Sequence, residues 1–506
     1  TSLKISPTGQ IIIDKVFVEN SSCLENTQGW SSVFSCLNKA RYGISWGVLG
    51  SATECWLITK NYVDKYIKNW APGRLERNIE AGEWRRLFKM KYNVLVEGPY
   101  LTQSGYGEHA RLVLNALRDL PEVDIYGIPL HWGKTSWISD DTPNREWMDE
   151  ISLKTTTPPE KFDLHVFVGM PVEFTKKAER AVCVTAGIEV DRVAPEWLIK
   201  TYEIDKIIVP SEFSKAVFQN SSYKTNPEEA EGNMPDEAKT LECQCPVEVV
   251  PYHIRDKKSS SLGLKFETKF NFLAVAQWGP RKNLENTIGW FVEEFKNSPE
   301  VGLVLKTSMA RNCNIDHEIT MKAIKEVVSR VDPENKKKCK VYLIHGDMTE
   351  EEMGSLYADR KIKAIVSATH GEGFGLPLFE AACHKLPVVA TNASGHLDFL
   401  YCADAEGKIK PHFAPVEFTI NEVPSQSVWE GVVPAKSRWA YPDRLSFREQ
   451  LRAVYEDYET YKGLAKRLHT SIKKDFSEAR VNHKLATGIM SVLESEFQDL
   501  EVEEFS

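Results

Sequence analysis

The chain lacks several patterns that mark common classes of protein. Its ten cysteines include no C-x-x-C pair and no grouping with histidine at zinc-ligand spacing, so no zinc module is expected. No apolar run is long enough to span a bilayer, and no signal peptide is visible. Scattered thiols in a chain of this size suit a reducing compartment, which predicts a cytoplasmic protein.

The chain also lacks an excess of positive charge. With 63 lysines and arginines against 72 aspartates and glutamates, the formal net charge is −9, so no nucleic-acid partner is expected. The acidic residues concentrate at 227–237 and 494–504, which we interpret as solvated segments.

What the chain does have, from Tyr92 onward, is an alternation of strand-like and helix-like segments that is typical of parallel α/β units. Two such series predict an α/β fold with two Rossmann-like, doubly wound domains that face each other across a cleft. The predicted strands are Asn93–Val96, Val123–Ile128, Leu164–Val168, Val182–Ala186, Lys206–Val209 and Val247–Val250, then Phe270–Ala276, Gly302–Lys306, Lys340–Ile344, Lys363–Ser367 and Pro387–Ala390. The predicted helices are Tyr106–Leu120, Pro195–Tyr202, Glu212–Asn220, Leu284–Lys296, Glu350–Asp359 and Pro377–His384, with further helices over Leu445–Phe497.

The most informative segment is 364–391, in which a β-branched strand enters a glycine-rich loop and a helix follows. Glu372 lies in the loop and Glu380 in the first helical turn, while Gly373 and Gly375 permit close approach of a ligand to the backbone. A helix N-terminus attracts anions, so the segment suits a ligand that is part polyol and part phosphate, such as a nucleotide-sugar. The alternative is that Glu380 complements the helix dipole and Glu372 is solvated.

This arrangement resembles the E-x₇-E signature of retaining glycosyltransferases with the GT-B fold, closest to glycosyltransferase family 4 (glycosyl transferases group 1). The resemblance covers about residues 90–500. It implies that Glu372 contacts the transferred sugar and that Glu380 holds the ribose hydroxyls. The intervening residues, whose amides would meet the diphosphate and sugar, are Gly373, Phe374, Gly375 and Leu376.

Arg281 and Lys282 follow a predicted strand and precede a helix, where they could stabilise a departing diphosphate. They resemble the R-K-G/N motif of family 4, whose lysine binds the diphosphate. That family has an earlier arginine near the place where this chain has Gln277, so Arg281 or Lys306 is left to supply the second charge. For Lys306 a solvated strand end is an equal alternative. No Asp-x-Asp pair follows a strand, so no essential metal ion is expected.

The glycine-rich turn at 102–111 resembles the N-terminal loop of family 4, which makes Gly105 and Gly107 candidate donor-binding residues. Glycine turns are also common packing devices at such junctions. His109 and His165 are weaker candidates for the acceptor site, with packing in the core as the favoured alternative. The segments Thr185–Glu189 and Pro210–Ser214 also resemble pieces of family members, and Ser211 is expected to cap a helix.

Residues 1–66 instead resemble an internal piece of glutaryl-CoA dehydrogenase, an acyl-CoA dehydrogenase, with Arg41 matching an arginine near that family's substrate. The parts that would complete a flavin pocket have no counterpart downstream, so we interpret this part as a remnant, a fusion or an assembly artefact. FAD is expected only if the fragment belonged to a complete dehydrogenase. The predicted division is 1–68 for this fragment, 69–90 for a linker, 91–258 for an acceptor domain, 259–470 for a donor domain, and 471–506 for a returning helix and tail.

The sequence therefore predicts a metal-independent, retaining, hexosyl-type glycosyltransferase without a cofactor. Its donor would be a nucleotide-sugar, and its acceptor a glycan, a lipid-linked molecule or a small molecule. A lipid-linked acceptor would bring the protein into peripheral contact with a membrane. The alternatives are a nucleotide-sugar epimerase or phosphorylase, a flavin-dependent dehydrogenase suggested by residues 1–66, and a non-catalytic GT-B scaffold.

Overall fold

The computed structural model describes residues 91–493, apart from 134, 139–142, 225–239, 256–260, 311 and 405. All described residues belong to one compact unit, Lys89–Ser506. The dehydrogenase-like segment with Arg41, the linker 69–90 and the two acidic segments lie outside the described residues, so their interpretations stay predictions. None of the helices in the described part of the chain combines the length and the apolar character that crossing a bilayer requires.

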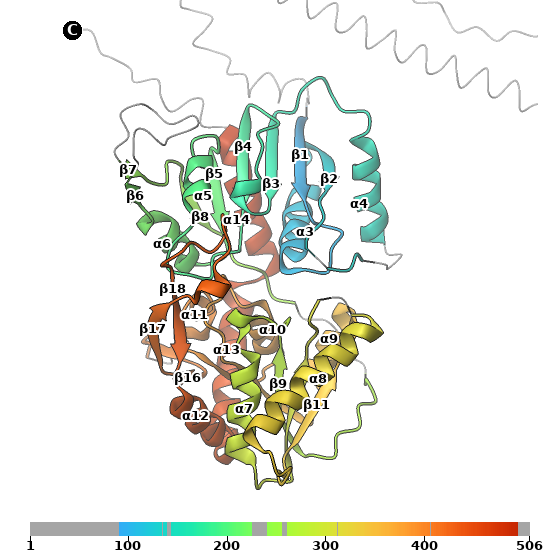
Figure 1. Cartoon of the computed structure of the whole chain (residues 1–506). Coiled ribbons are helices and arrows are strands. Elements are labelled where there is room, and N and C mark those ends of the chain that lie inside the picture. Colours follow the sequence, from blue (N-terminus) through green and yellow to red (C-terminus); the bar gives the residue numbers. More distant parts are fainter. Residues whose placement is uncertain are drawn as a thin grey trace, which may run out of the picture. The chain divides into compact units, whose positions relative to one another are not determined.

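The first half of the described chain, here called the N-lobe (residues 91–255), is built on a six-stranded sheet in the order β2-β1-β3-β4-β5-β8 (Figure 1). All neighbouring strands are parallel, and their side chains are buried because helices cover the faces of the sheet. The strands are β1 (Tyr92–Gly98), β2 (Val123–Pro129), β3 (Leu164–Val168), β4 (Arg180–Val184), β5 (Lys206–Val209) and β8 (Val247–Val249). The helices are α3 (Gly105–Arg118), α4 (Pro143–Lys154), α5 (Pro195–Lys200) and α6 (Glu212–Asn220), with the 3₁₀ turn η3 (Pro171–Glu173).

The second half, here called the C-lobe (residues 261–475), repeats the plan with the order β11-β10-β9-β12-β13-β16, again parallel throughout. Its strands are β9 (Phe270–Val275), β10 (Val301–Lys306), β11 (Lys340–Ile344), β12 (Ile362–Ser367), β13 (Val388–Thr391) and β16 (Ala414–Val416). Its helical elements are η4 (Pro280–Lys282), α7 (Leu284–Phe295), α8 (Asn314–Val331), α9 (Glu350–Tyr357), α10 (Leu376–Cys383), α11 (Leu397–Leu400), α12 (Arg444–Glu456) and α13 (Tyr458–Asp475). The predicted α/β fold with two Rossmann-like domains is therefore confirmed.

The last described helix, α14 (Glu478–Met490), returns to the N-lobe (Figure 1, red). It packs against α3, and Lys206 Nζ on β5 donates a 2.7 Å hydrogen bond to Ser491 Oγ just beyond α14. A helix from the end of the chain therefore fastens the C-lobe to the N-lobe.

The sequence did not predict α4, α8 or β16, nor an antiparallel hairpin of β17 (Phe418–Glu422) and β18 (Arg438–Pro442). It also missed the short antiparallel pairs β6 (Tyr223–Lys224) with β7 (Thr240–Leu241) and β14 (Tyr401–Ala403) with β15 (Ile409–Pro411). Predicted strand Val182–Ala186 begins two residues earlier, at Arg180, because Arg180 pairs with Leu164 of β3.

Candidate active site

A cleft of about 1110 Å³ lies between the lobes and is lined by residues of both. Its walls come from the loops at the carboxyl ends of parallel strands, which is where open α/β sheets bind ligands. The predicted site residues that line it are Glu372, Lys282, Arg281, Glu380, Gly373, Phe374, Gly375, Leu376, Lys306 and Gly105. Gly107, His109 and His165 are not among its lining residues.

Glu372 is at the centre of an ion-pair cluster. Lys282 Nζ lies 2.6 Å from Glu372 Oε1 and 2.8 Å from Oε2, and Arg281 Nη1 lies 3.2 Å from Oε2. Arg281 Nη1 also donates to the Gly371 carbonyl at 2.6 Å, while the Glu372 amide donates to Ser394 Oγ at 2.9 Å. The loop after β12 and the turn after β9 are thereby fixed to each other.

Burial and the neighbouring charges shift the pKa of Glu372 in opposite directions. Burial alone would raise the pKa of Glu372, but the charges of Lys282 and Arg281 reverse that effect and hold the pKa at about 2. Burial and the neighbouring Arg281 lower the pKa of Lys282, and Glu372 only partly offsets them. The carboxylate is therefore ionised at physiological pH, and an ionised, doubly paired carboxylate is poorly suited to proton transfer.

Glu189 joins the cluster from the other lobe. Arg281 Nε lies 2.7 Å from Glu189 Oε2, in the loop that follows β4. Burial raises the pKa of Glu189, and Arg281 opposes that shift without reversing it. The resemblance of the segment Thr185–Glu189 to pieces of family members was a signal for this residue, but it did not assign the residue a role.

The glycine residues of the loop before α10 have structural roles that the sequence did not predict. A Cβ atom on Gly373 would lie 2.0 Å from the Ala186 carbonyl oxygen, so this glycine permits the close approach of the other lobe. Ser211 caps α6 as predicted, accepting from Ser214 N, and its hydroxyl also donates to the Gly373 carbonyl at 2.6 Å. Gly375 precedes α10 with φ of 86°, a left-handed conformation that favours glycine.

Glu380 lies on α10, farther along the cleft. Tyr357 Oη donates to Glu380 Oε2 at 3.0 Å, and Arg255 Nη1 lies 3.8 Å from Oε1. Arg255, which follows β8, also contacts Glu108 of α3 at 2.6 Å and lies 3.8 Å from Glu350 of α9. Burial lowers the pKa of Arg255, but the surrounding carboxylates reverse this and raise it above its ordinary value. The sequence offered no signal for Arg255, because its partners are distant along the chain.

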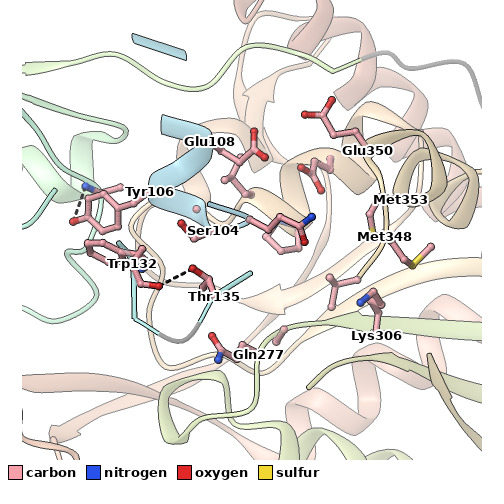
Figure 2. A pocket seen from close by; sticks show the side chains of 18 of the residues that line it. Ser104, Tyr106, Glu108, Trp132, Thr135, Gln277, Lys306, Met348, Glu350 and Met353 are labelled. Carbon is pink, nitrogen blue, oxygen red and sulfur yellow. Dashed lines mark hydrogen bonds between the residues drawn. The ribbon is translucent and has the colours of Figure 1, made fainter. Parts of the chain in front are cut away.

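Lys306 lies on one side of the cleft with Met348 and Met353, while Tyr106 and Trp132 lie on the other (Figure 2). Its Nζ donates to the Gly346 carbonyl at 2.5 Å, and burial lowers its pKa. The cleft therefore has a C-lobe side around α9 and an aromatic side formed by the start of α3 and the loop after β2 of the N-lobe.

Three of the predicted site residues make contacts that are typical of packing in the core; they are Gly107, His109 and His165. A Cβ on Gly107 would lie 2.2 Å from the Thr102 carbonyl oxygen, so this glycine is needed for packing within the N-lobe. His109 is fully buried against Tyr252, with ring centroids 4.9 Å apart, and burial lowers its pKa to about 3. His165 is also fully buried, with Nε2 2.9 Å from Glu97 Oε2. The packing alternative suits both histidines, and their acceptor role stays a prediction.

Among the described residues, no group of three or more histidine, cysteine, aspartate or glutamate side chains is placed to hold a metal ion. The expectation that catalysis needs no metal stays a prediction.

The architecture matches that of sucrose-phosphate synthase from Thermosynechococcus elongatus, with a TM-score of 0.53 over 80% of this chain and 100% of that one, at 13% sequence identity. The fold is GT-B. HepE from Anabaena, solved in complex with UDP-glucose, aligns with a TM-score of 0.46 over 79% of this chain and 99% of that one, at 13% identity.

Among curated proteins, the serotype-specific mannosyltransferase WbdA of Escherichia coli is 30% identical over 119 residues. The match spans 24% of this chain and 13% of that relative, a small part of its length. No protein-family model matches the chain.

Proposed function

We propose that this protein is a retaining glycosyltransferase that moves a hexosyl group from a nucleotide-sugar to an acceptor hydroxyl. One observation carries the proposal: the Lys282–Arg281–Glu372 cluster and Glu380 line a single cleft between two Rossmann-like lobes. Cations for a diphosphate and carboxylates for sugar hydroxyls are thus within one site. The match to a mannosyltransferase over 24% of the chain agrees with this activity.

Lys282 and Arg281 are the groups proposed to receive the diphosphate. The leaving nucleoside diphosphate gains negative charge as the glycosidic bond breaks, and buried cations stabilise that charge more strongly than exposed ones. Both side chains are largely buried and are held in place by Glu372 and Glu189. Lys306 at the end of β10 offers a further positive charge along the same wall.

Glu380 is proposed to accept hydrogen bonds from the ribose hydroxyls, because a carboxylate can accept from two neighbouring hydroxyl groups. Tyr357 and Arg255 fix its position. The backbone from Gly373 to Leu376 would then lie between the ribose and the transferred sugar, beside the diphosphate.

In the proposed reaction, the acceptor oxygen forms a bond to the anomeric carbon on the face from which the phosphate departs. The bond from that carbon to the phosphate oxygen breaks, its electron pair stays with the phosphate, and the acceptor proton passes to a phosphate oxygen. Glu372, with its low pKa, is not the proton carrier in this scheme. It is proposed to orient the sugar hydroxyls, while closure of the cleft excludes water that would otherwise hydrolyse the donor.

The test begins with a thermal-shift screen of UDP-, GDP-, ADP- and TDP-sugars, since a donor that binds the folded protein stabilises it by an amount that grows with the logarithm of its concentration over Kd. Turnover with the donor found is then measured in EDTA, and the anomeric configuration of the product is read by NMR. We expect a retained configuration and undiminished activity in EDTA. An inverted product would reject the retaining mechanism, and a strict metal requirement would reject metal independence.

Site-directed variants test the role proposed for each residue. Glu372→Gln and Lys282→Met are each expected to lower kcat/KM by about 100-fold, as expected for the loss of a group that stabilises the transition state. Glu285→Gln is the matched control, because its carboxylate is exposed and pairs with Arg330 at the surface. Full activity in Glu372→Gln would show that the site is misassigned.

A further inference from the structure

Trp429 is a large aromatic side chain that is 60% exposed and yet lines the cleft. It lies in the loop that joins β17 to β18, a hairpin of the C-lobe. Aromatic side chains in the lining of a cleft are typical of ligand-binding sites, because an indole presents a large apolar face to a bound molecule.

The loop that carries Trp429 is rigidly braced. The backbone of Trp429 pairs with that of Val433, with N–O distances of 3.1 and 2.7 Å. Two residues beyond Trp429, the carbonyl of Gly431 accepts a 2.7 Å hydrogen bond from Trp197 Nε1 of the N-lobe. The backbone that carries the exposed ring is therefore held by both lobes, which reduces the entropy that ordering this loop on binding would cost.

The hairpin lies beside the Glu372 end of the cleft. On β18, the Ala440 amide donates to the His370 carbonyl, two residues before Glu372, at 3.1 Å. Also on β18, Arg438 Nε lies 2.8 Å from Asp191, two residues after Glu189. β18 thus lies beside the loops that carry Glu372 and Glu189, where the proposed function places the transferred sugar, and Trp429 of the same hairpin lines the same cleft.

A second tryptophan lines the same cleft from the N-lobe. The ring of Trp132 packs on Tyr106 with a centroid separation of 4.1 Å, and Tyr106 Oη accepts from the amide of Gly187 at 2.9 Å (Figure 2). Gly187 is in the loop that carries Glu189. The hydroxyl of Thr135 donates to the Trp132 carbonyl at 2.6 Å, and the cleft lining also includes the polar residues Ser136 and Asn144.

We propose that Trp429 is a stacking platform for a pyranose ring, so that the acceptor of the proposed glycosyltransferase is an oligosaccharide. This inference rests on the proposed function. A pyranose has one face of polarised C–H groups and an edge of hydroxyls. The electron-rich face of an indole complements the first, and polar side chains of the cleft lining complement the second.

The charges of the loop favour a carbohydrate over a membrane surface. Trp429 is followed by the exposed Glu430, and the exposed Lys436 balances that charge within the same loop. Arg438 is engaged by Asp191. An anionic bilayer attracts clusters of unpaired lysine and arginine, which this loop does not present.

The test is calorimetric titration of the full-length protein with maltohexaose, cellohexaose and α-1,6-linked mannohexaose. We expect at least one to bind, Trp429→Ala to weaken that binding by about tenfold, and Trp429→Tyr to retain most of it. Ile420→Ala is the matched control, since Ile420 is an exposed apolar residue on β17 of the same hairpin and is not among the cleft-lining residues.

Sedimentation with phosphatidylcholine vesicles, with and without phosphatidylglycerol, tests whether Trp429 binds a membrane surface instead of a carbohydrate. Binding to vesicles that Trp429→Ala abolishes would overturn the proposal in favour of a membrane contact. Failure of all three hexasaccharides to bind, or equal binding by wild type and Trp429→Ala, would also overturn it. Binding of the UDP-, GDP-, ADP- and TDP-sugars by wild-type protein is measured in parallel by thermal shift, so that failure of the proposed function is recognised separately from failure of the stacking platform.

Discussion

Glu372 shows how one buried side chain can be held in its charged form. Burial penalises its charge, but Lys282 and Arg281 each lie within 3.2 Å of its oxygens and more than offset that penalty. The three side chains are mutually dependent, because a buried charge without its partner is strongly destabilising. Removing any one of them should therefore affect both stability and ligand binding.

The stability of the cluster should depend on pH. The pKa of Glu372 is about 2 in the folded protein against 4.5 ordinarily, so its stabilising effect is complete above about pH 4.5 and is lost as the pH falls towards 2. We expect Glu372→Gln to lower the free energy of unfolding at pH 7 by about 3 kcal/mol, because two buried cations lose their partner. Urea unfolding at pH 7 and pH 3 measures this difference, which should be smaller at pH 3. An equal difference at both values would contradict the assigned pKa.

Sequence patterns predicted those site residues that belong to local motifs. Glu372 and Lys282 each follow a recognisable strand and precede a helix, and Glu380 lies in the helix after Glu372, so their place at a sheet edge could be inferred. Arg255 and Glu189 could not be predicted in the same way. They meet Glu380 and Arg281 only because the lobes face each other, and no spacing in the sequence encodes that contact.

At the scale of elements, the loop before α10 is shaped by its neighbours. Gly373 lies against the backbone of the loop after β4 so closely that a methyl group would overlap with the Ala186 carbonyl oxygen. Ser211 secures the same peptide from α6. The loop that carries Glu372 is therefore positioned by the N-lobe as well as by its own strand, β12.

We expect Gly373→Ala to separate these two loops, because backbone atoms have little freedom to move aside. The apparent Kd of the nucleotide-sugar donor should rise by about tenfold, since part of the binding energy is then used to close the cleft. Gly463→Ala on α13 is the control, because a Cβ there meets no atom within 4 Å. It should leave donor affinity unchanged. Unaltered affinity in Gly373→Ala would show that the contact does not position the loop.

The elements that sequence predicted best are those whose burial is uniform. The eleven predicted strands are all in the two sheets, since runs of β-branched residues buried on both faces are easily recognised. The helix α8 was missed because its buried positions include Asp316 and Thr320, which weaken the apolar periodicity. β16 was missed because it is three residues long and contains Pro415.

At the scale of the whole described unit, the lobes are joined by polar contacts that surround the Glu372 end of the cleft. Each contact pairs a residue of the loops or helices after β4 and β5 with a residue of the C-lobe. The pairs are Glu189 with Arg281, Asp191 with Arg438, Trp197 with Gly431, Ser211 with Gly373, and Glu212 with Asp398.

Asp398 makes one of these contacts sensitive to pH. Its Oδ2 accepts from the Glu212 amide at the start of α6, and burial raises its pKa to about 6 from 3.8. A raised pKa means that the folded state favours the protonated form, so this group's stabilisation is present below pH 3.8 and is lost as the pH rises through 6. The carboxyl of Glu212 lies nearby and adds to the shift.

We therefore expect Asp398→Asn, which can still accept the hydrogen bond, to raise Tm at pH 7.5 by roughly 1–3 °C and to have little effect near pH 4. Asp398→Ala should be less stable than Asp398→Asn at both values, because it loses the hydrogen bond as well. Scanning calorimetry of the three proteins measures these differences. A lower Tm for Asp398→Asn at pH 7.5 would contradict the assignment.

The pairing of Lys282 with Glu372 also bears on which anions the protein binds. Inorganic phosphate or sulfate would have to displace a carboxylate that Lys282 already holds at 2.6 Å, and its negative charge would repel the displaced group. Under the proposed function, a nucleotide-sugar would compensate both members of the pair at once, with phosphate oxygens for the ammonium and hydroxyls for the carboxylate. The ion pair would then favour the complete donor over a simple anion.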